Sequence, residues 1–295
     1  MAVSLSYNTI LERFIDFSKI RQDIRLVMVI GSRAREDHPA DEWSDLDLVF
    51  VTSNPREYIS SQDWLTELGE YILTFLEHTP DGSSMERRVL FEGGFDVDFV
   101  PVPLDMIRNG LPPEANSIIS RGYKILLDKD GLESMIASSS DSRVLNASPP
   151  NQTEYEQTVD DFLYHVVWTA KKLRRGELWA AKQCCDGYLK WRLLKMIEWH
   201  AKWATRDVKL FDVWHEGRFL DTWAERRVLE GLSASFAHYD VDDVWQALMQ
   251  TLALFTLLAR EVADGVGLPR PEGVCAKITS LVDSYRAGRG ATSDK

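Results

Sequence analysis

The sequence predicts an α+β fold, with a mixed sheet and flanking helices in its N-terminal half and a helical bundle in its C-terminal half. Apolar runs of strand length, separated by turn residues, fill the first half. In the second half, apolar residues recur at the i, i+3, i+4, i+7 spacing of helices. The chain of 295 residues also exceeds the usual ~100–200 residues of one domain, so we expect two domains.

A change of composition marks the domain boundary. Residues 138–152 are rich in Ser, Asp, Asn and Pro, and they predict a linker between domains at 1–137 and 153–286. Residues 287–295 are small and polar, and we expect them to form a disordered tail.

The N-terminal domain is expected to begin with a helix and two strands. Thr9 and Glu12 have the spacing of a capping box at the start of a helix. Strands are predicted at residues 25–30 and 48–52, with a turn and one helical turn between them. An apolar stripe over residues 63–76 then predicts a crossover helix.

The rest of this domain is predicted to be strands. Residues 88–91 and 95–102 flank a Glu-Gly-Gly turn and indicate a hairpin. Asp96 and Asp98 share one face of its second strand. Residues 123–128 predict a further strand.

The C-terminal domain is predicted to contain three long helices. Apolar periodicity indicates helices at about 159–173, 177–203 and 242–264, the last ending before Gly265. Antiparallel packing of these helices would give a bundle.

The stretch between the first two strands carries the residues for chemistry. Asp45 and Asp47 are two residues apart at the start of a strand, so their side chains point to one face, about 6.5–7 Å apart. Carboxylates that close repel each other unless a cation lies between them. Hard oxygen ligands suit Mg²⁺, which completes its shell with water and substrate phosphates. The alternative is a hairpin with two surface aspartates.

Gly31 and Ser32 supply the complementary half of such a site. Glycine lets the backbone approach a ligand, and a serine at a helix start offers its hydroxyl and nearby N–H groups, so we expect a triphosphate to bind there. The order strand, Gly-Ser, twelve residues and Asp-Leu-Asp resembles the signature of the DNA polymerase beta-like nucleotidyltransferase superfamily. That resemblance implies a third carboxylate on a neighbouring strand, for which we choose Asp98, with Asp96 in reserve.

A narrower resemblance covers about residues 10–285 and is to the aminoglycoside 6-adenylyltransferases, the streptomycin-modifying group. The motifs that carry it are Gly31-Ser32-Arg33, Asp45-x-Asp47, Val97-Asp98-Phe99 before a proline, Lys124-x-Leu126-Leu127-Asp128-Lys129-Asp130, and Leu193-Leu194-x-Met196 with Trp199-His200. The resemblance implies Mg-dependent transfer of AMP from ATP to a hydroxyl of an aminoglycoside such as streptomycin. Pyrophosphate would leave, and the modification would confer antibiotic resistance.

The same resemblance implies roles for the acidic residues. Asp45, Asp47 and Asp98 would bind two Mg²⁺ ions, one activating the attacking hydroxyl and the other stabilising the leaving pyrophosphate. Asp98 can act as metal ligand and as base, although another carboxylate remains open as the base.

It also implies roles for residues that bind ATP. Ser32 and the backbone of Gly31 would hold the β- and γ-phosphates, and Arg33 would neutralise charge there. Lys171, on the first bundle helix, is placed to reach the triphosphate, with a solvated helix face as an equal alternative.

A cationic acceptor needs carboxylates and aromatic faces, which the helical half contains. The candidates are Asp160, Asp161, Glu177, Asp186 and Glu198, with Trp168, Trp179, Trp191 and Tyr188 among them.

Charge and hydropathy narrow the function classes. The 34 Lys and Arg residues against 46 Asp and Glu residues give a net charge of -12, which disfavours nucleic-acid binding and attracts cations. No apolar run reaches the ~18 residues of a membrane span, so we expect a cytoplasmic protein. Separately, we expect the protein to be a monomer. The alternatives are a nucleotidyltransferase acting on another small molecule or a protein hydroxyl, or a non-catalytic nucleotide-binding module. Three clustered carboxylates argue against the last.

Overall fold

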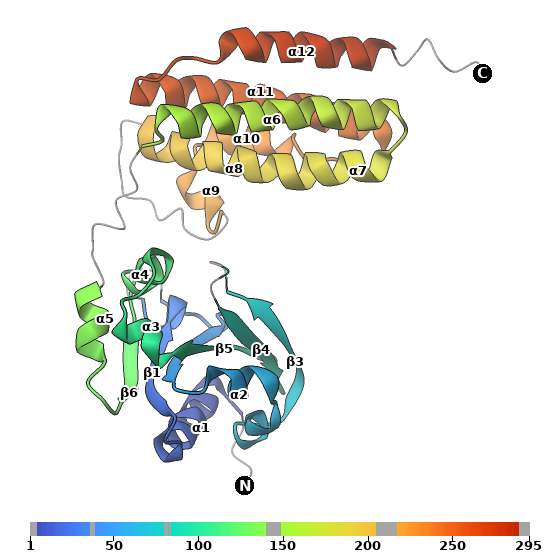
Figure 1. Ribbon diagram of the computed structural model, residues 1–295. Helices are drawn as coiled ribbons and strands as arrows, with labels where there is room; N and C mark the ends of the chain where they lie inside the picture. The colour runs from blue at the N-terminus through green and yellow to red at the C-terminus, as the bar shows by residue number, and fades with distance from the viewer. Residues whose placement is uncertain are drawn as a thin grey trace. The chain divides into compact units, whose positions relative to one another are not determined.

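The computed structural model of the protein describes residues 5–35, 39–79, 82, 84–139, 149–204 and 217–288. The chain divides into two compact units, Met1–Ala147 and Ser148–Lys295 (Figure 1). Residues 140–148 of the predicted linker and 289–295 of the predicted tail lie outside the described residues. The predicted linker and tail therefore stay predictions.

The first unit is built on a six-stranded sheet in the order β3-β4-β5-β2-β1-β6 (Figure 1). Strands β2 and β5 run parallel, and the other neighbouring strands are antiparallel. This mixed sheet, with the helical unit that follows it, confirms the predicted fold class. The strands are β1 (Ile24–Ile30), β2 (Leu46–Thr52), β3 (Tyr71–His78), β4 (Met85–Phe91), β5 (Phe95–Pro103) and β6 (Lys124–Asp128).

One face of the sheet is covered by α1 (Tyr7–Ile20) and α2 (Pro55–Ser60), with a 3-10 turn at Asp63–Glu67. The ring of Phe14 from α1 lies 5.2 Å, between centroids, from the ring of Phe50 on β2. Aromatic packing of this kind joins the helix to the central strand.

The opposite face is covered by three short helices, α3 (Leu104–Arg108), α4 (Pro113–Ile119) and α5 (Glu133–Ser139). Val49 and Val51 of β2 point into this second core. Asp47 has the same parity along the strand, so it points to this face at the start of β2. The strand alternation thus separates the acidic residue from the aromatic core behind it.

Two predictions for this unit are wrong. The stretch 63–76 is not a helix: Asp63–Glu67 forms a 3-10 turn, residues 68–70 form a connection, and residues 71–76 belong to the edge strand β3. Its aromatic and aliphatic residues match a strand as well as a helix, and pairing with β4 decides between the two. The helix cap is Ser6 and not Thr9, because the Ser6 hydroxyl accepts the Thr9 N–H at 3.1 Å.

The second unit is a bundle in which α6, α8 and α11 lie side by side, with α12 packed along α6 and α11 (Figure 1). The rings of Phe162 and Phe255 stack at 3.6 Å, and the Tyr155 hydroxyl donates to the Ala259 carbonyl at 2.8 Å. The helices are α6 (Gln152–Arg174), α7 (Leu178–Gln183), α8 (Leu189–Trp199), α9 (Leu220–Trp223), α10 (Arg226–Ser233), α11 (Val241–Val266) and α12 (Glu272–Ala287).

The predicted helix at 177–203 is a helical run with π-turns at Cys184–Tyr188 and His200–Ala204. The helix predicted at 242–264 is α11, which continues through Gly265 and ends at the cap residue Gly267, whose φ of 75° is left-handed. A left-handed glycine is a common helix stop, so the prediction chose the wrong glycine of two. Across the described ranges, the structure contains no helix with the length and apolar character of a membrane span.

Candidate active site

The three predicted carboxylates converge at one end of the sheet. Asp47 of β2 lies opposite Asp98 of β5 in the parallel register, and Asp45 directly precedes β2. One carboxylate oxygen of each residue lies within 4.8 Å of the others, and this is the group of possible metal ligands found among the described residues. The reserve candidate Asp96 is exposed and lies outside this group. Its carboxylate instead accepts a hydrogen bond from the Tyr7 hydroxyl at 2.6 Å.

Burial and mutual repulsion perturb two of these carboxylates. Burial raises the pKa of Asp47 to about 7, with further contributions from the negative charges of Asp45 and Asp98. Burial also raises the pKa of Asp98 to about 7; Arg88 opposes this increase and Glu86 adds to it. Charged carboxylates at this distance require a cation between them, so the donor set fits Mg²⁺.

Gly31 makes room for this arrangement. It begins a 3-10 turn at Gly31–Arg33, directly after β1, with a left-handed φ of 69°. A Cβ atom added there would lie 2.1 Å from Asp47 Oδ2. The glycine is therefore required by the position of Asp47 itself, in addition to any ligand that approaches the turn.

Ser32 offers an unused hydroxyl in the same turn. Its Oγ is buried and has no hydrogen-bond partner among the described residues. A buried hydroxyl without a partner is costly, and it becomes favourable when a ligand oxygen accepts from it. This orphaned atom fits a phosphate group beside Gly31.

Arg33 has contacts that the sequence did not indicate. Its guanidinium donates to the Asp45 carbonyl at 2.8 Å and to the Ser44 carbonyl at 2.6 Å. It also lies 3.8 Å from the ring centroid of Tyr7, a cation–π contact. These bonds hold the backbone that carries Asp45, so Arg33 supports the acidic group in the present structure.

Lys171 belongs to the second unit and is exposed on α6. With Trp168, Lys172, Arg174, Arg175 and Tyr285, it lines a recess of about 490 Å³. The structure thus groups Lys171 with other cations, and its contact with a triphosphate stays a prediction.

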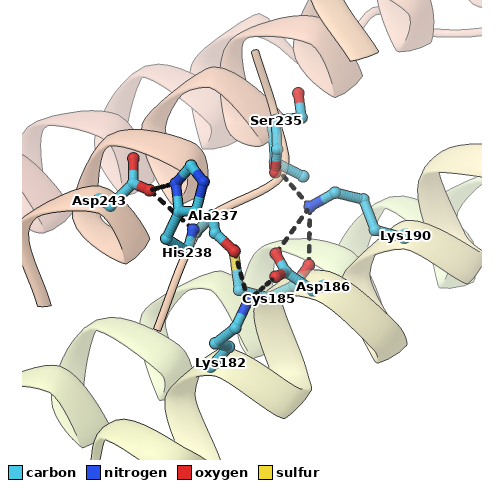
Figure 2. A network of polar contacts seen from close by, with 9 residues as sticks. Lys182, Cys185, Asp186, Lys190, Ser235, Ala237, His238 and Asp243 are labelled. Atoms are coloured by element: carbon cyan, nitrogen blue, oxygen red, sulfur yellow. Dashed lines mark hydrogen bonds and ion pairs between the residues drawn. The ribbon is translucent and has the colours of Figure 1, made fainter. Parts of the chain in front are cut away.

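Most acidic candidates for the acceptor already have cationic partners. Figure 2 shows Lys182 and Lys190 approaching Asp186 from two sides. Arg192 pairs with Asp161, and Lys172 pairs with Glu177. Among the predicted carboxylates, Asp160 is exposed, and burial raises the pKa of Glu198 to about 7.

Sequence reasoning missed Glu86 and Arg88 of β4. Arg88 lies opposite Asp98 in the antiparallel pairing, and its guanidinium is 3.3 Å from Asp98 Oδ2. The signal was available, since counting back from the predicted Glu-Gly-Gly turn pairs residue 88 with residue 98.

The chain is similar to known aminoglycoside-modifying proteins. A protein-family model described as streptomycin adenylyltransferase matches residues 5–284. An aminoglycoside 6-adenylyltransferase of Bacillus subtilis (strain 168) is 24% identical over 273 residues, which cover 90% of this chain and 93% of that protein. Another protein of that name, from Campylobacter jejuni, is 24% identical over 256 residues, covering 84% and 85%.

Solved structures are also similar. The crystal structure of an aminoglycoside 6-adenyltransferase from Bacillus subtilis aligns with a TM-score of 0.44 and 20% identity, over 96% of this chain and 99% of that one. A nucleotidyltransferase-like protein from Exiguobacterium sibiricum aligns with a TM-score of 0.33 and 13% identity, over 95% and 91%.

Proposed function

This chain belongs to the streptomycin adenylyltransferase family, and we propose that it transfers AMP from ATP to a hydroxyl of an aminoglycoside, with streptomycin as the acceptor. As a member of that family it is a nucleotidyltransferase that uses ATP. The proposal extends this to the acceptor, to dependence on Mg²⁺ and to a role in antibiotic resistance. A cytoplasmic location and a monomeric state remain predictions from the sequence.

The observation that carries the proposal is the convergence of Asp45, Asp47 and Asp98 within 4.8 Å. Three carboxylates that repel one another have no evident structural use, since they destabilise the fold that holds them. Two Mg²⁺ ions bound by them would supply charge neutralisation at the reacting phosphate and at the leaving pyrophosphate.

The chain's own residues have distinct tasks in this reaction. The hydroxyl of Ser32 would donate to a phosphate oxygen, next to the N–H groups of the turn that begins at Gly31. Arg33 would keep Asp45 in place through its bonds to the backbone. Lys171 of the helical unit is proposed as a further cation for the triphosphate.

Asp98 is the proposed base. The acceptor oxygen forms a bond to the α-phosphorus, the bond from that phosphorus to the bridging oxygen breaks, and pyrophosphate leaves. The hydroxyl proton moves to the Asp98 carboxylate, which lies within 4.8 Å of Asp45 and Asp47 and so beside the atoms that react.

The acceptor is the part that experiment must decide. We expect ATP and Mg²⁺ to give pyrophosphate release that streptomycin stimulates. Since the chain has a net charge of -12, the KM for this cation should rise with NaCl more than the KM for ATP does. If a neutral small molecule or a protein stimulates pyrophosphate release and no aminoglycoside does, that molecule is the acceptor and streptomycin is not. A chain that binds ATP without any release would be a binding module.

A further inference from the structure

Arg88 of β4 lies between two buried carboxylates. One is Asp98 of the acidic group formed by Asp45, Asp47 and Asp98, and the other is Glu86. Arg88 Nη2 is 3.3 Å from Asp98 Oδ2, and Arg88 Nε is 2.9 Å from Glu86 Oε1. On its outer side, Arg88 Nε is 3.0 Å from Glu77 Oε2 of the edge strand. One guanidinium therefore links carboxylates from three adjacent strands.

The strand register brings these groups together. Arg88 of β4 lies opposite Asp98 of β5, and Asp98 lies opposite Asp47 of β2. The three side chains form one row across the sheet on the same face. Glu86 is two residues from Arg88 on β4 and points to that face as well.

Burial makes this contact more than a surface ion pair. The side chains of Glu86 and Asp98 are 6% and 11% exposed, whereas that of Arg88 is 42% exposed. A buried carboxylate needs a partner that both neutralises it and donates hydrogen bonds. Arg88 supplies this to Glu86 and reaches Asp98 with a different nitrogen, so Glu86 fixes the direction from which Arg88 meets Asp98.

We propose that Arg88 is a positioning residue for Asp98: anchored by Glu86, it holds one oxygen of Asp98 and leaves the other for the metal site and the proton of the acceptor. This inference rests on the proposed function, because it assigns a purpose to the orientation of Asp98. It differs from a charge effect, since the N–H groups of a planar guanidinium point in fixed directions, whereas the three N–H groups of an ammonium rotate and hold a partner less precisely.

The test compares Arg88→Lys and Arg88→Ala with the wild-type full chain. Both variants should lower kcat by about tenfold or more, with the KM for ATP within about threefold, because a misdirected Asp98 affects the reaction more than ATP binding. Ethylguanidinium should restore part of the activity of Arg88→Ala, and ethylammonium should not. The Arg88 side chain is exposed enough for such a molecule to enter.

A binding measurement separates geometry from charge without using activity. Mn²⁺ titration of the ATP-free protein, followed by electron paramagnetic resonance of the free ion, should show about threefold weaker binding to Arg88→Lys, which keeps the charge. The matched control is Arg25→Ala, which breaks the Arg25–Asp130 ion pair on β1 of the same sheet. The control should retain wild-type kcat and Mn²⁺ binding.

Wild-type kcat and Mn²⁺ affinity in Arg88→Lys, or equal rescue of Arg88→Ala by ethylguanidinium and ethylammonium, would show that only charge matters and would overturn the proposal. If Arg88→Ala does not fold, Arg88→Lys and the Mn²⁺ titration still decide. If the wild-type chain transfers AMP to no acceptor, the proposed function fails while the Mn²⁺ comparison still tests Arg88.

Discussion

Two carboxylates of the helical unit and two carboxylates of the acidic group in the sheet unit have pKa shifts of opposite sign. In the helical unit, Lys172 holds the pKa of Glu177 below its usual range, and Arg227 does the same for Glu261. In the sheet unit, burial and neighbouring carboxylates raise the pKa values of Asp47 and Asp98 to about 7. In the bundle, Glu177 and Glu261 are paired with cations, whereas at one end of the sheet the carboxylates of Asp45, Asp47 and Asp98 lie within 4.8 Å of one another.

This difference points to where chemistry takes place. A fold gains little from a carboxylate that its neighbours repel, so such groups mark a site where binding supplies the missing charge. Glu177 and Glu261, whose charges are balanced by cations of the protein, leave little charge for a ligand. Four predictions test this contrast, beginning with the largest effect.

Removing one charge of the acidic group should abolish most activity. We expect Asp47→Asn to keep the fold and to lose more than about a hundredfold in kcat, because a lost metal ligand removes several kcal/mol of transition-state stabilisation. Steady-state kinetics with a melting curve check this. The control is Asp130→Asn, which removes a carboxylate already paired with Arg25 and should change kcat by less than about twofold. If Asp47→Asn and Asp130→Asn lower kcat by similar amounts, Asp47 has no special role in the reaction.

The second-largest effect on kcat is expected when an added side chain crowds the acidic group. In Gly31→Ala the new Cβ atom would lie 2.1 Å from Asp47 Oδ2, so the carboxylate must move. We expect a loss of about tenfold or more in kcat and about 1–3 kcal/mol of stability, measured by kinetics and urea unfolding.

A matched glycine separates strain from crowding. Gly131 has nearly the same φ, 72°, but no atom of the residues that the structure describes lies within 4 Å of an added Cβ atom. Gly131→Ala should therefore show the backbone strain without the loss of kcat. Equal kcat losses in the two variants would mean that Asp47 tolerates the displacement.

The orphaned hydroxyl should matter for ATP alone. We expect Ser32→Ala to raise the KM for ATP by about tenfold, since a hydrogen bond to a charged group contributes about 1.5–3 kcal/mol. The melting temperature should not fall, because the hydroxyl has no hydrogen-bond partner among the described residues. The Ser18 Oγ is also buried and has no partner in the described part of the chain, and Ser18→Ala should leave the KM for ATP unchanged. An unaltered KM in Ser32→Ala would exclude the hydroxyl from the phosphate site.

The smallest expected effect is on stability and concerns Glu198, a carboxylate of the bundle whose pKa is raised. Burial raises the pKa of Glu198 from 4.5 to about 7, while Lys202 and Lys195 lower it. The folded state therefore binds this proton more tightly than the unfolded chain. The resulting penalty is absent below about pH 4.5, grows as the pH rises and is complete above about pH 7.

We expect Glu198→Gln to stabilise the helical unit by about 1–2 kcal/mol at pH 8 and to have little effect at about pH 4.5. Urea unfolding followed by tryptophan fluorescence reports on this unit, since only Trp43 and Trp64 of the ten tryptophans lie outside it. A stabilisation that does not depend on pH would contradict the raised pKa of Glu198. A large rise in the KM for streptomycin would instead assign Glu198 to the acceptor.

The sequence by itself determined the features that depend on short spacing. The parity of Asp45 and Asp47 follows from their two-residue separation. The hairpin at the Glu-Gly-Gly turn and the long periodic helices α6 and α11 likewise arise from local patterns. Such patterns are readable because the backbone geometry of a strand or helix repeats within a few residues.

Only the tertiary structure decided the features that depend on partners distant in the chain. The stretch 63–76 could pack as a helix or pair as a strand, and β4 settled the choice. Arg33 holds Asp45 and contacts Tyr7 because the 3-10 turn and α1 meet there. Arg88 reaches Asp98 because two strands pair in one register. Hydrogen bonds across a sheet and the burial of charge depend on which segments meet, and residue types alone do not specify that.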